Sequence, residues 1–126
     1  MKIAIACVLV AGLLPWVCAG VAKWGFRDFD NHNPRDWLAR QTGFRARGNA
    51  AQHNSFEAFP FFAVGVVLAT LAQADRARVD LYAIVFVLAR LAFIYCYLSD
   101  KALARSLFWV VGLISAVGLY AAALGY

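Results

Sequence analysis

The chain has 126 residues, a formal net charge of +5 and 63% hydrophobic residues, and its mean hydropathy is +0.67. This length allows one domain, and this hydropathy excludes an ordinary soluble domain of the same size. Charged residues are almost absent from residues 3–22, 48–74, 81–99 and 106–126. The composition therefore predicts helices that cross a membrane.

The four apolar segments predict an all-α integral membrane four-helix bundle with up-down-up-down topology, as a single domain over residues 1–126. Each segment reaches the roughly 20 residues that an α-helix needs to cross about 30 Å of hydrocarbon. We expect the helices at about residues 3–22, 46–72, 79–98 and 105–125.

The first segment permits a second interpretation. Lys2 followed by an apolar run and by VCAG is also typical of a secretory signal peptide that ends in a cleavage site. The run is long for a signal peptide, and three further apolar segments follow it. We therefore favour a membrane helix, bent at Pro15, and N-terminal sequencing of the mature protein distinguishes the two interpretations.

The segment of residues 23–47 mixes basic side chains with aromatic ones such as Trp24 and Trp37. Aromatic rings and long cations are both stable in the headgroup layer of a membrane. The sequence DNHNPRDW predicts a turn followed by a short interfacial helix that begins near Pro34.

Neither the acidic residues of this segment nor the cysteines indicate a metal site. Asp28, Asp30 and His32 lack the glycine and the distal glutamate of a calcium loop. The cysteines lie inside predicted helices without metal-ligand spacing, so we expect packed free thiols and no disulfide. They are Cys7, Cys18 and Cys96.

Lysine and arginine residues are concentrated in two of the predicted loops. Residues 23–47 and 99–105 carry most of them, whereas the other side of the bundle has Lys2, Arg76 and Arg78. Because loops rich in basic residues stay in the cytoplasm, we expect these two loops inside and both termini outside. The basic excess indicates topology and lipid contact rather than nucleic-acid binding.

Two charged residues lie inside the apolar segments, Glu57 in the second and Arg90 in the third. Counted from the cytoplasmic ends at 1.5 Å per residue, both lie roughly 13–15 Å deep. A charge at this depth is costly and needs a partner. The matching depth predicts a Glu57–Arg90 ion pair, which is either a structural pair between the two helices or part of a ligand site. Pro60 bends the second helix close by.

Further polar residues follow the same helix faces in the cytoplasmic half. Residues seven apart share a helix face, which places Arg47 with Asn54 and Arg90 with Tyr97. Such a set favours a site for a small, polar, largely anionic ligand that enters from the cytoplasm. Its members are Arg47, Asn54, Glu57, Arg90, Tyr97 and Arg105.

The segment NSFEAFP resembles the second-helix signature of the MAPEG family, the membrane-associated proteins of eicosanoid and glutathione metabolism. That signature is Asn-x-x-Glu-x-x-Pro with an arginine seven residues before the asparagine, and here it is formed by Asn54, Glu57, Pro60 and Arg47. ARLAFIYCY and the later ARS are similar to the third and fourth helices of the family. The resemblance covers essentially the whole chain and is greatest to bacterial members.

The resemblance implies a homotrimer in the bacterial inner membrane that binds glutathione between neighbouring protomers near the cytoplasmic face. It implies that Arg47, Asn54 and Glu57 hold the polar groups of the peptide and that Tyr97 lines the site. We expect Arg90 and His53 to belong to the same binding set. It also implies that Arg105 and Ser106 stabilise the thiolate, since a nearby guanidinium lowers the pKa of a thiol. No metal is implied.

The sequence departs from the family pattern at three positions. Ala50 and His53 stand where relatives carry arginines, and Phe93 stands where relatives often carry tyrosine or histidine. Fewer cations favour a weaker or differently placed thiol ligand. If protonated, His53 replaces part of that charge.

Three functions remain open at this point. The first is a glutathione-dependent membrane transferase or peroxidase. The second is a non-catalytic protein of the same fold that binds a lipid or another thiol. The third is a proton-coupled exporter, which is disfavoured because such exporters carry their glutamate in the first helix, and residues 3–22 have no charge.

Overall fold

The structure, a computed structural model, describes residues 2–25 and 27–126 of the chain. Within these residues five helices follow one another and no strand occurs. The helices are α1 (Lys2–Lys23), α2 (Pro34–Ala39), α3 (Gly43–Leu71), α4 (Arg76–Leu98) and α5 (Ala102–Ala123). Among them, α1, α3, α4 and α5 are long and apolar enough to cross a membrane. The expectation of an all-helical protein with four long apolar helices is confirmed.

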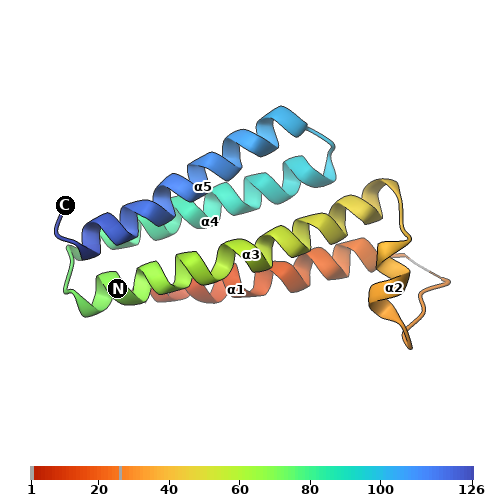
Figure 1. The fold of residues 1–126 in the computed structure, drawn as a ribbon, viewed down its shortest axis with the longest axis horizontal. Helices are drawn as coiled ribbons and strands as arrows, with labels where there is room; N and C mark the ends of the chain where they lie inside the picture. Colours follow the sequence, from red (N-terminus) through yellow and green to blue (C-terminus); the bar gives the residue numbers. More distant parts are fainter. Residues whose placement is uncertain (1, 26) are drawn as a thin grey trace.

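The long helices lie side by side, and successive ones run in alternate directions (Figure 1). Helix α1 packs along α3, and α4 packs along α5. Helix α3 also contacts α4 and α5, and the short helix α2 lies against it. Both ends of the chain lie at the end of the bundle opposite α2 (Figure 1). Helix α3 therefore contacts every other helix, while α4 packs on α1 and α5 as well.

Helices α3, α4 and α5 begin before the apolar runs from which the sequence predicted them. Their first turns include charged residues, because the backbone hydrogen bonds of a helix are indifferent to side-chain hydropathy. These residues are Arg45, Arg76, Arg78 and Arg105. At the start of α4, the side chain of Asp75 caps the helix by accepting a hydrogen bond from the amide of Arg78. Helix α2 begins at Pro34, as predicted, where a missing amide hydrogen costs nothing.

Small residues make many of the contacts between helices, and many large apolar side chains point outward. The side chains of Leu9, Trp16, Leu88 and Ile114 are at least 60% exposed, as is typical of a surface that lipid covers. The buried small residues include Ala4, Ala11, Cys18, Ala22, Ala51, Ala69 and Ala83. The bundle thus combines close helix–helix approach at small residues with a core of large side chains such as Phe62, Phe86 and Leu119.

Two glycines mark the closest approaches between helices. A Cβ atom at Gly118 would lie 2.7 Å from the ring of Tyr82, so α5 packs closely on α4 at this glycine. A Cβ atom at Gly48 would lie 2.9 Å from the Cβ atom of Ala22, which the sequence did not reveal. Both interfaces, α4–α5 and α1–α3, therefore require a residue without a side chain.

The loop before α2 is organised by Asp30. Its carboxylate accepts hydrogen bonds from the amides of His32 and Asn33 and from the Asn33 side chain. These bonds, chiefly the one from the His32 amide, hold the pKa of Asp30 below its usual range. Asp30 thus shapes a turn. In the described part of the chain, no group of three or more His, Cys, Asp or Glu side chains is placed to hold a metal ion.

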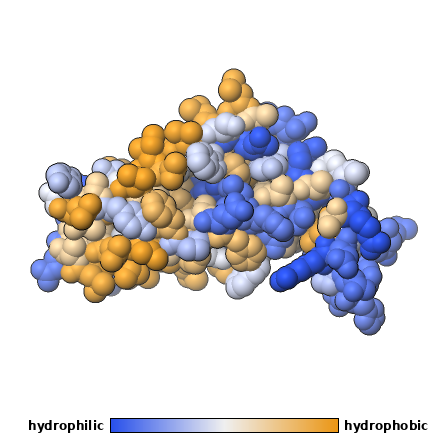
Figure 2. Space-filling model, viewed as in Figure 1, coloured by the Kyte–Doolittle hydropathy of each residue, from blue (hydrophilic) through white to orange (hydrophobic). Residues whose placement is uncertain are grey.

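Hydrophilic side chains gather at the α2 end of the molecule and reach inward across one face (Figure 2). The rest of this face is largely hydrophobic. A hydrophilic strip that enters an apolar surface is expensive in a membrane and marks a site where polar groups meet partners.

Candidate functional site

Arg90 lies at the centre of the polar residues and is 3% exposed. Its Nη1 atom donates a hydrogen bond of 2.8 Å to Oδ1 of Asn54, and its Nη2 atom donates one of 3.0 Å to Oγ of Ser55. Its guanidinium carbon lies 4.1 Å from the centre of the Phe93 ring. A buried cation is therefore held by two neutral oxygen atoms and an aromatic face.

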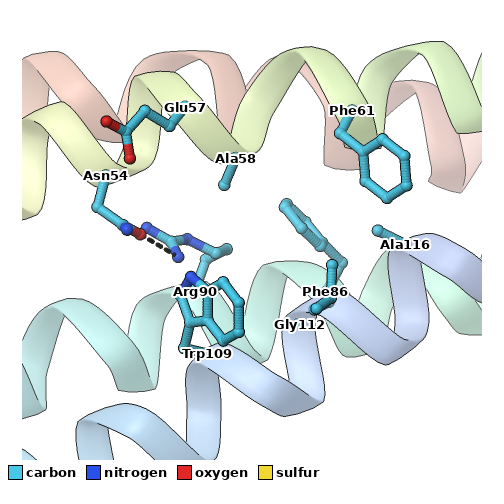
Figure 3. A pocket seen from close by; sticks show the side chains of 10 residues that line it. Asn54, Glu57, Ala58, Phe61, Phe86, Arg90, Trp109, Gly112 and Ala116 are labelled. Carbon is cyan, nitrogen blue, oxygen red and sulfur yellow. Dashed lines mark hydrogen bonds between the residues drawn. The ribbon is translucent and has the colours of Figure 1, made fainter.

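The predicted Glu57–Arg90 ion pair is wrong. The hydrogen bonds of Arg90 go to Asn54 and Ser55, and Glu57 is exposed and forms no hydrogen bond or ion pair with any described residue. Figure 3 shows the guanidinium reaching Asn54 while the Glu57 carboxylate stands apart on α3. The two residues do line one cavity, but they are not in contact as a pair.

The physical reason for this error is the rotation of α3 about its axis. Ser55 faces α4 and is 3% exposed. A helix turns about 100° per residue, so Glu57 lies roughly 200° further round and points away from α4. Counting depth along the helix placed Glu57 and Arg90 at the same level but did not give the direction of either side chain.

Cations and aromatic rings alternate along the α2 end of α4 and into α5. The rings of Phe93 and Tyr97 meet edge to face, with their centres 5.5 Å apart. Arg90 stacks on Phe93, and the guanidinium carbon of Arg105 lies 4.5 Å from the centre of the Tyr97 ring. The predicted shared face of Arg90, Phe93 and Tyr97 is confirmed, and it extends to Arg105. Contact with ring faces stabilises both cations at a place where water is scarce.

The other predicted site residues lie at this end of the bundle in different roles. The Nε atom of Arg47 donates a hydrogen bond of 3.3 Å to the carbonyl of Leu98, which ties α3 to the end of α4. The hydroxyl of Ser106 donates to the carbonyl of Ala102 in its own helix. His53 is exposed. Arg47 and Ser106 thus already have hydrogen-bond partners within the protomer.

An apolar cavity of about 260 Å³ lies between α3, α4 and α5. One end is polar and is formed by Asn54, Glu57 and Arg90 (Figure 3). The remaining walls are Ala58, Phe61, Phe86, Trp109, Gly112, Leu113 and Ala116. An apolar cavity with a few polar groups at one end is the usual form of a small-molecule site.

A larger and more polar cavity, of about 750 Å³, lies between α2 and α3. Its lining carries two cations, two carboxylates, an imidazole and two amides, in a volume typical of a small-molecule site. These side chains belong to Lys23, Arg35, Asp36, Asn49, Gln52, His53 and Glu57. Glu57 lines both cavities and stands in the wall between them.

The structure therefore brings the predicted residues together in two places. Glu57 and His53 line the polar cavity, and Asn54 and Arg90 line the apolar one. Tyr97 and Arg105 pack on each other and belong to the lining of neither cavity. A single protomer does not assemble the whole predicted set around one ligand.

The sequence analysis missed Ser55, the hydrogen-bond partner of Arg90, and several residues that line the cavities. Ser55 belongs to a row of small buried residues with Gly48 and Ala51, a spacing that signals the face of α3 turned inward. Gln52 lies two residues before Asn54, and this proximity could have identified it. Lys23 and Trp109 lie on other helices, so no neighbouring residue in the sequence indicates that they line a cavity.

One of three comparisons with known proteins identifies a family. The model of the MAPEG family matches residues 3–125 of the chain. No curated protein and no solved structure matches the chain. The matched range contains every residue that lines the two cavities.

Proposed function

This chain belongs to the MAPEG family and is an integral membrane protein, and from that premise we propose that it is a glutathione-dependent transferase or peroxidase. Family membership indicates a membrane function related to glutathione or eicosanoids. In the proposed reaction, an activated glutathione thiolate attacks a lipophilic electrophile or a hydroperoxide. The protein would work as a homotrimer in the bacterial inner membrane, with both termini outside the cytoplasm.

The observation that carries this proposal is the unpaired carboxylate of Glu57. It lies in a helix long and apolar enough to cross a membrane, yet it has no hydrogen-bond or ionic partner among the described residues. An acidic group near the centre of a bilayer costs about 2.5–3.5 kcal/mol on insertion scales. Such a group is retained for function, and its partner must come from a ligand or a neighbouring subunit. Glutathione carries an ammonium group that fits this role.

The polar cavity beside Glu57 supports a zwitterionic peptide as the ligand. Lys23 and Arg35 offer positive charge to the two carboxylates of glutathione. Gln52 and His53 offer hydrogen bonds to its peptide groups. A volume of about 750 Å³ is within the usual range for a ligand of this size.

Asn54, Arg90 and Arg47 act next to this cavity. Because Oδ1 of Asn54 accepts from Arg90, its amide NH₂ group is free to donate to the ligand. Arg90 is then a positioning residue for Asn54. Arg47 uses its Nε atom to hold Leu98, and its two terminal nitrogens form no hydrogen bond with described residues, so they are available to a ligand carboxylate.

Arg105 and Tyr97 are suited to hold the thiolate. The guanidinium is held over the ring, and the Tyr97 hydroxyl forms no hydrogen bond with described residues. A positive charge and a hydroxyl donor both stabilise a sulfur anion, which lowers the pKa of the thiol. Ser106 supports this role less, because its hydroxyl donates to its own helix.

The chemistry follows from the thiolate. In conjugation, sulfur bonds to an electrophilic carbon, the leaving group departs with its electron pair, and the thiol proton passes to water. In peroxide reduction, sulfur bonds to the terminal oxygen, the O–O bond breaks, and an alcohol leaves after protonation. A second glutathione then forms the disulfide and releases water.

Two protomers supply one site in this proposal. Glu57 lines the polar cavity and Arg105 does not, which favours a site to which different copies of the chain contribute these two residues. The family's trimer supplies such a neighbour.

Complementation between inactive variants tests this arrangement. We expect Glu57→Gln and Arg105→Leu each to reduce conjugation of glutathione with a chloronitrobenzene in detergent. Co-expression of the two variants, with purification through two different tags, should restore part of the activity, because mixed trimers contain sites with both native residues. No recovery in verified mixed trimers would refute the shared site, and no activity of the wild type with any electrophile would refute the enzyme.

A second candidate is a non-catalytic protein of the same fold that binds a thiol or a lipid. The observation that favours it is the engaged hydroxyl of Ser106, together with Ala50 where relatives carry a cation. A rise of the Tm with glutathione concentration but no turnover would support this candidate.

A further inference from the structure

An apolar groove of about 490 Å³ lies at the end of α1 that is next to α2 (Figure 1). Phe44, in the first turn of α3, forms one of its walls. The other walls come from the last turns of α1 and the residue after it, and they are Val17, Gly20, Val21 and Trp24. The groove shares no residue with the polar cavity or with the apolar cavity. The proposed function therefore leaves it without a role.

The groove runs along one outward face of α1. Val17, Val21 and Trp24 follow one another at intervals of four and three residues, which places them in one row on a helix. Gly20 lies beside this row, and a Cβ atom there would meet nothing within 4 Å. From Val17 to Trp24 the helix rises roughly 10 Å at 1.5 Å per residue. A hollow of this length on an apolar helix face is suited to one hydrocarbon chain.

Aromatic rings and a cation lie at the mouth of the groove. Trp24 is 83% exposed and Phe44 is 42% exposed, as is typical of rings at the boundary between hydrocarbon and headgroups. The Nη2 atom of Arg45 donates a hydrogen bond of 3.1 Å to the carbonyl of Trp24, which holds the guanidinium beside the groove. A guanidinium donates in several directions at once, so the bond to a carbonyl does not prevent contact with a phosphate.

The charge of this end of the bundle selects the headgroup. Residues 23–47 carry six basic and three acidic side chains, whereas residues 73–80 at the opposite end carry two of each. Each basic side chain near an anionic membrane surface contributes an attraction on the order of 1 kcal/mol. A lipid with a net negative headgroup is therefore attracted to the groove more strongly than a zwitterionic lipid.

We propose that this groove binds an anionic phospholipid, with one acyl chain along α1 and the phosphate against Arg45. The chain passes Trp24 and the hollow at Gly20 and ends near Val17, deeper in the membrane. The bound lipid joins the end of α1 to the start of α3, next to Lys23, which lines the polar cavity. This binding does not rest on the proposed function.

Photoreactive phospholipids test the proposal. The protein is reconstituted in nanodiscs of phosphatidylcholine that contain a small fraction of phosphatidylglycerol with a diazirine on one acyl chain, and labelled peptides are mapped by mass spectrometry. The matched probe is phosphatidylcholine with the same chains and the same diazirine. We expect saturable labelling of residues 17–24 by the phosphatidylglycerol probe, and labelling about tenfold weaker or less by the phosphatidylcholine probe. High salt should reduce this difference.

Filling the groove tests the place of the acyl chain. Gly20→Leu fills the hollow without a clash, since nothing lies within 4 Å of its added Cβ atom. Val10→Leu is the control, because it adds bulk at another exposed position of α1, outside the groove. We expect Gly20→Leu to abolish the saturable labelling and Val10→Leu to keep it, with both variants keeping the Tm of the wild type.

Charge variants test the place of the headgroup. Arg45→Gln should remove the preference for phosphatidylglycerol, and Arg45→Lys should keep most of it because the positive charge stays. Arg76→Gln removes the same charge at the opposite end of the bundle and should leave the preference unchanged. If Arg45→Gln does not fold, the comparison of Arg45→Lys with Gly20→Leu still decides the question, because a site of the proposed kind survives the first change and not the second.

The outcomes separate this inference from the proposed function. Equal labelling by the two probes, labelling spread evenly over the exposed faces of α1 and α5, or saturable labelling that persists in Gly20→Leu overturns the inference. Displacement of the phosphatidylglycerol probe by inorganic phosphate alone shows an anion site without an acyl chain and also overturns it. Saturable labelling in a protein that does not bind glutathione supports the lipid site and overturns the proposed function.

Discussion

Glu57→Gln is the substitution that best separates ligand binding from folding. The carboxylate is exposed and has no partner among the described residues, so the folded protomer loses no hydrogen bond when its charge is removed. Substitutions of this kind change stability by about 0.5 kcal/mol or less. A charge-assisted hydrogen bond to the ligand is worth about 1.5–3 kcal/mol. Since each 1.4 kcal/mol is a factor of ten, glutathione binding should weaken about 10- to 100-fold.

Asn54→Ala is the matched comparison on the same helix. It removes the 2.8 Å hydrogen bond from Arg90 and leaves a buried cation with one partner fewer. Leaving such a donor unsatisfied costs about 1–3 kcal/mol, so this variant should lose stability as well as binding. Glu57→Gln should weaken glutathione binding without lowering the Tm of the free protein, whereas Asn54→Ala should lower both.

The assay is thermal unfolding in detergent at increasing glutathione concentration, which yields the Tm of the free protein and the dissociation constant together. We expect Glu57→Gln to keep the Tm of the free protein and to need far more glutathione for the same rise. A clear fall of the free Tm would show that Glu57 has a structural partner. Unchanged glutathione affinity would show that the ligand does not contact the carboxylate. Either result refutes the reasoning.

Four further outcomes are expected. Gly48→Ala should lower the free energy of unfolding by about 1–3 kcal/mol, because the added methyl group forces α1 and α3 apart. Gly20→Ala is the control, since nothing lies within 4 Å of its added Cβ atom, and it should not lower stability. Equal Tm values for the two variants would contradict the packing. Arg105→Leu should raise the pH at which the conjugation rate is half-maximal, since the bound thiol loses the cation that lowers its pKa, and a pH–rate profile identical to that of the wild type would exclude this role. Tyr97→Leu should produce a smaller shift of that profile in the same direction, because Arg105 loses the ring that holds it. Ser106→Ala should change the rate little, because its hydroxyl is bound to its own helix, and a loss comparable to that of Arg105→Leu would show that the hydroxyl turns to the ligand.

The sequence by itself determined which segments form membrane helices. Long runs without charge have one stable form in a bilayer, the helix, because every backbone polar group must be paired within the segment. The sequence also identified Glu57 and Arg90 as candidate site residues, because a charged side chain within an apolar membrane helix is energetically costly and therefore rare. Spacing by seven correctly grouped Arg90 with Tyr97, because both lie on one helix and the period of a helix is local information.

Only the tertiary structure decided which side chains meet. The depth of Glu57 and Arg90 followed from counting residues, but the rotation of α3 against α4 turned Ser55 and Asn54 toward the guanidinium and Glu57 away from it. Rotation is set by packing of small residues such as Gly48 against a neighbouring helix, and this depends on both helices at once. For the same reason the two cavities, with Lys23 and Trp109 in their linings, became visible only when distant segments were brought together.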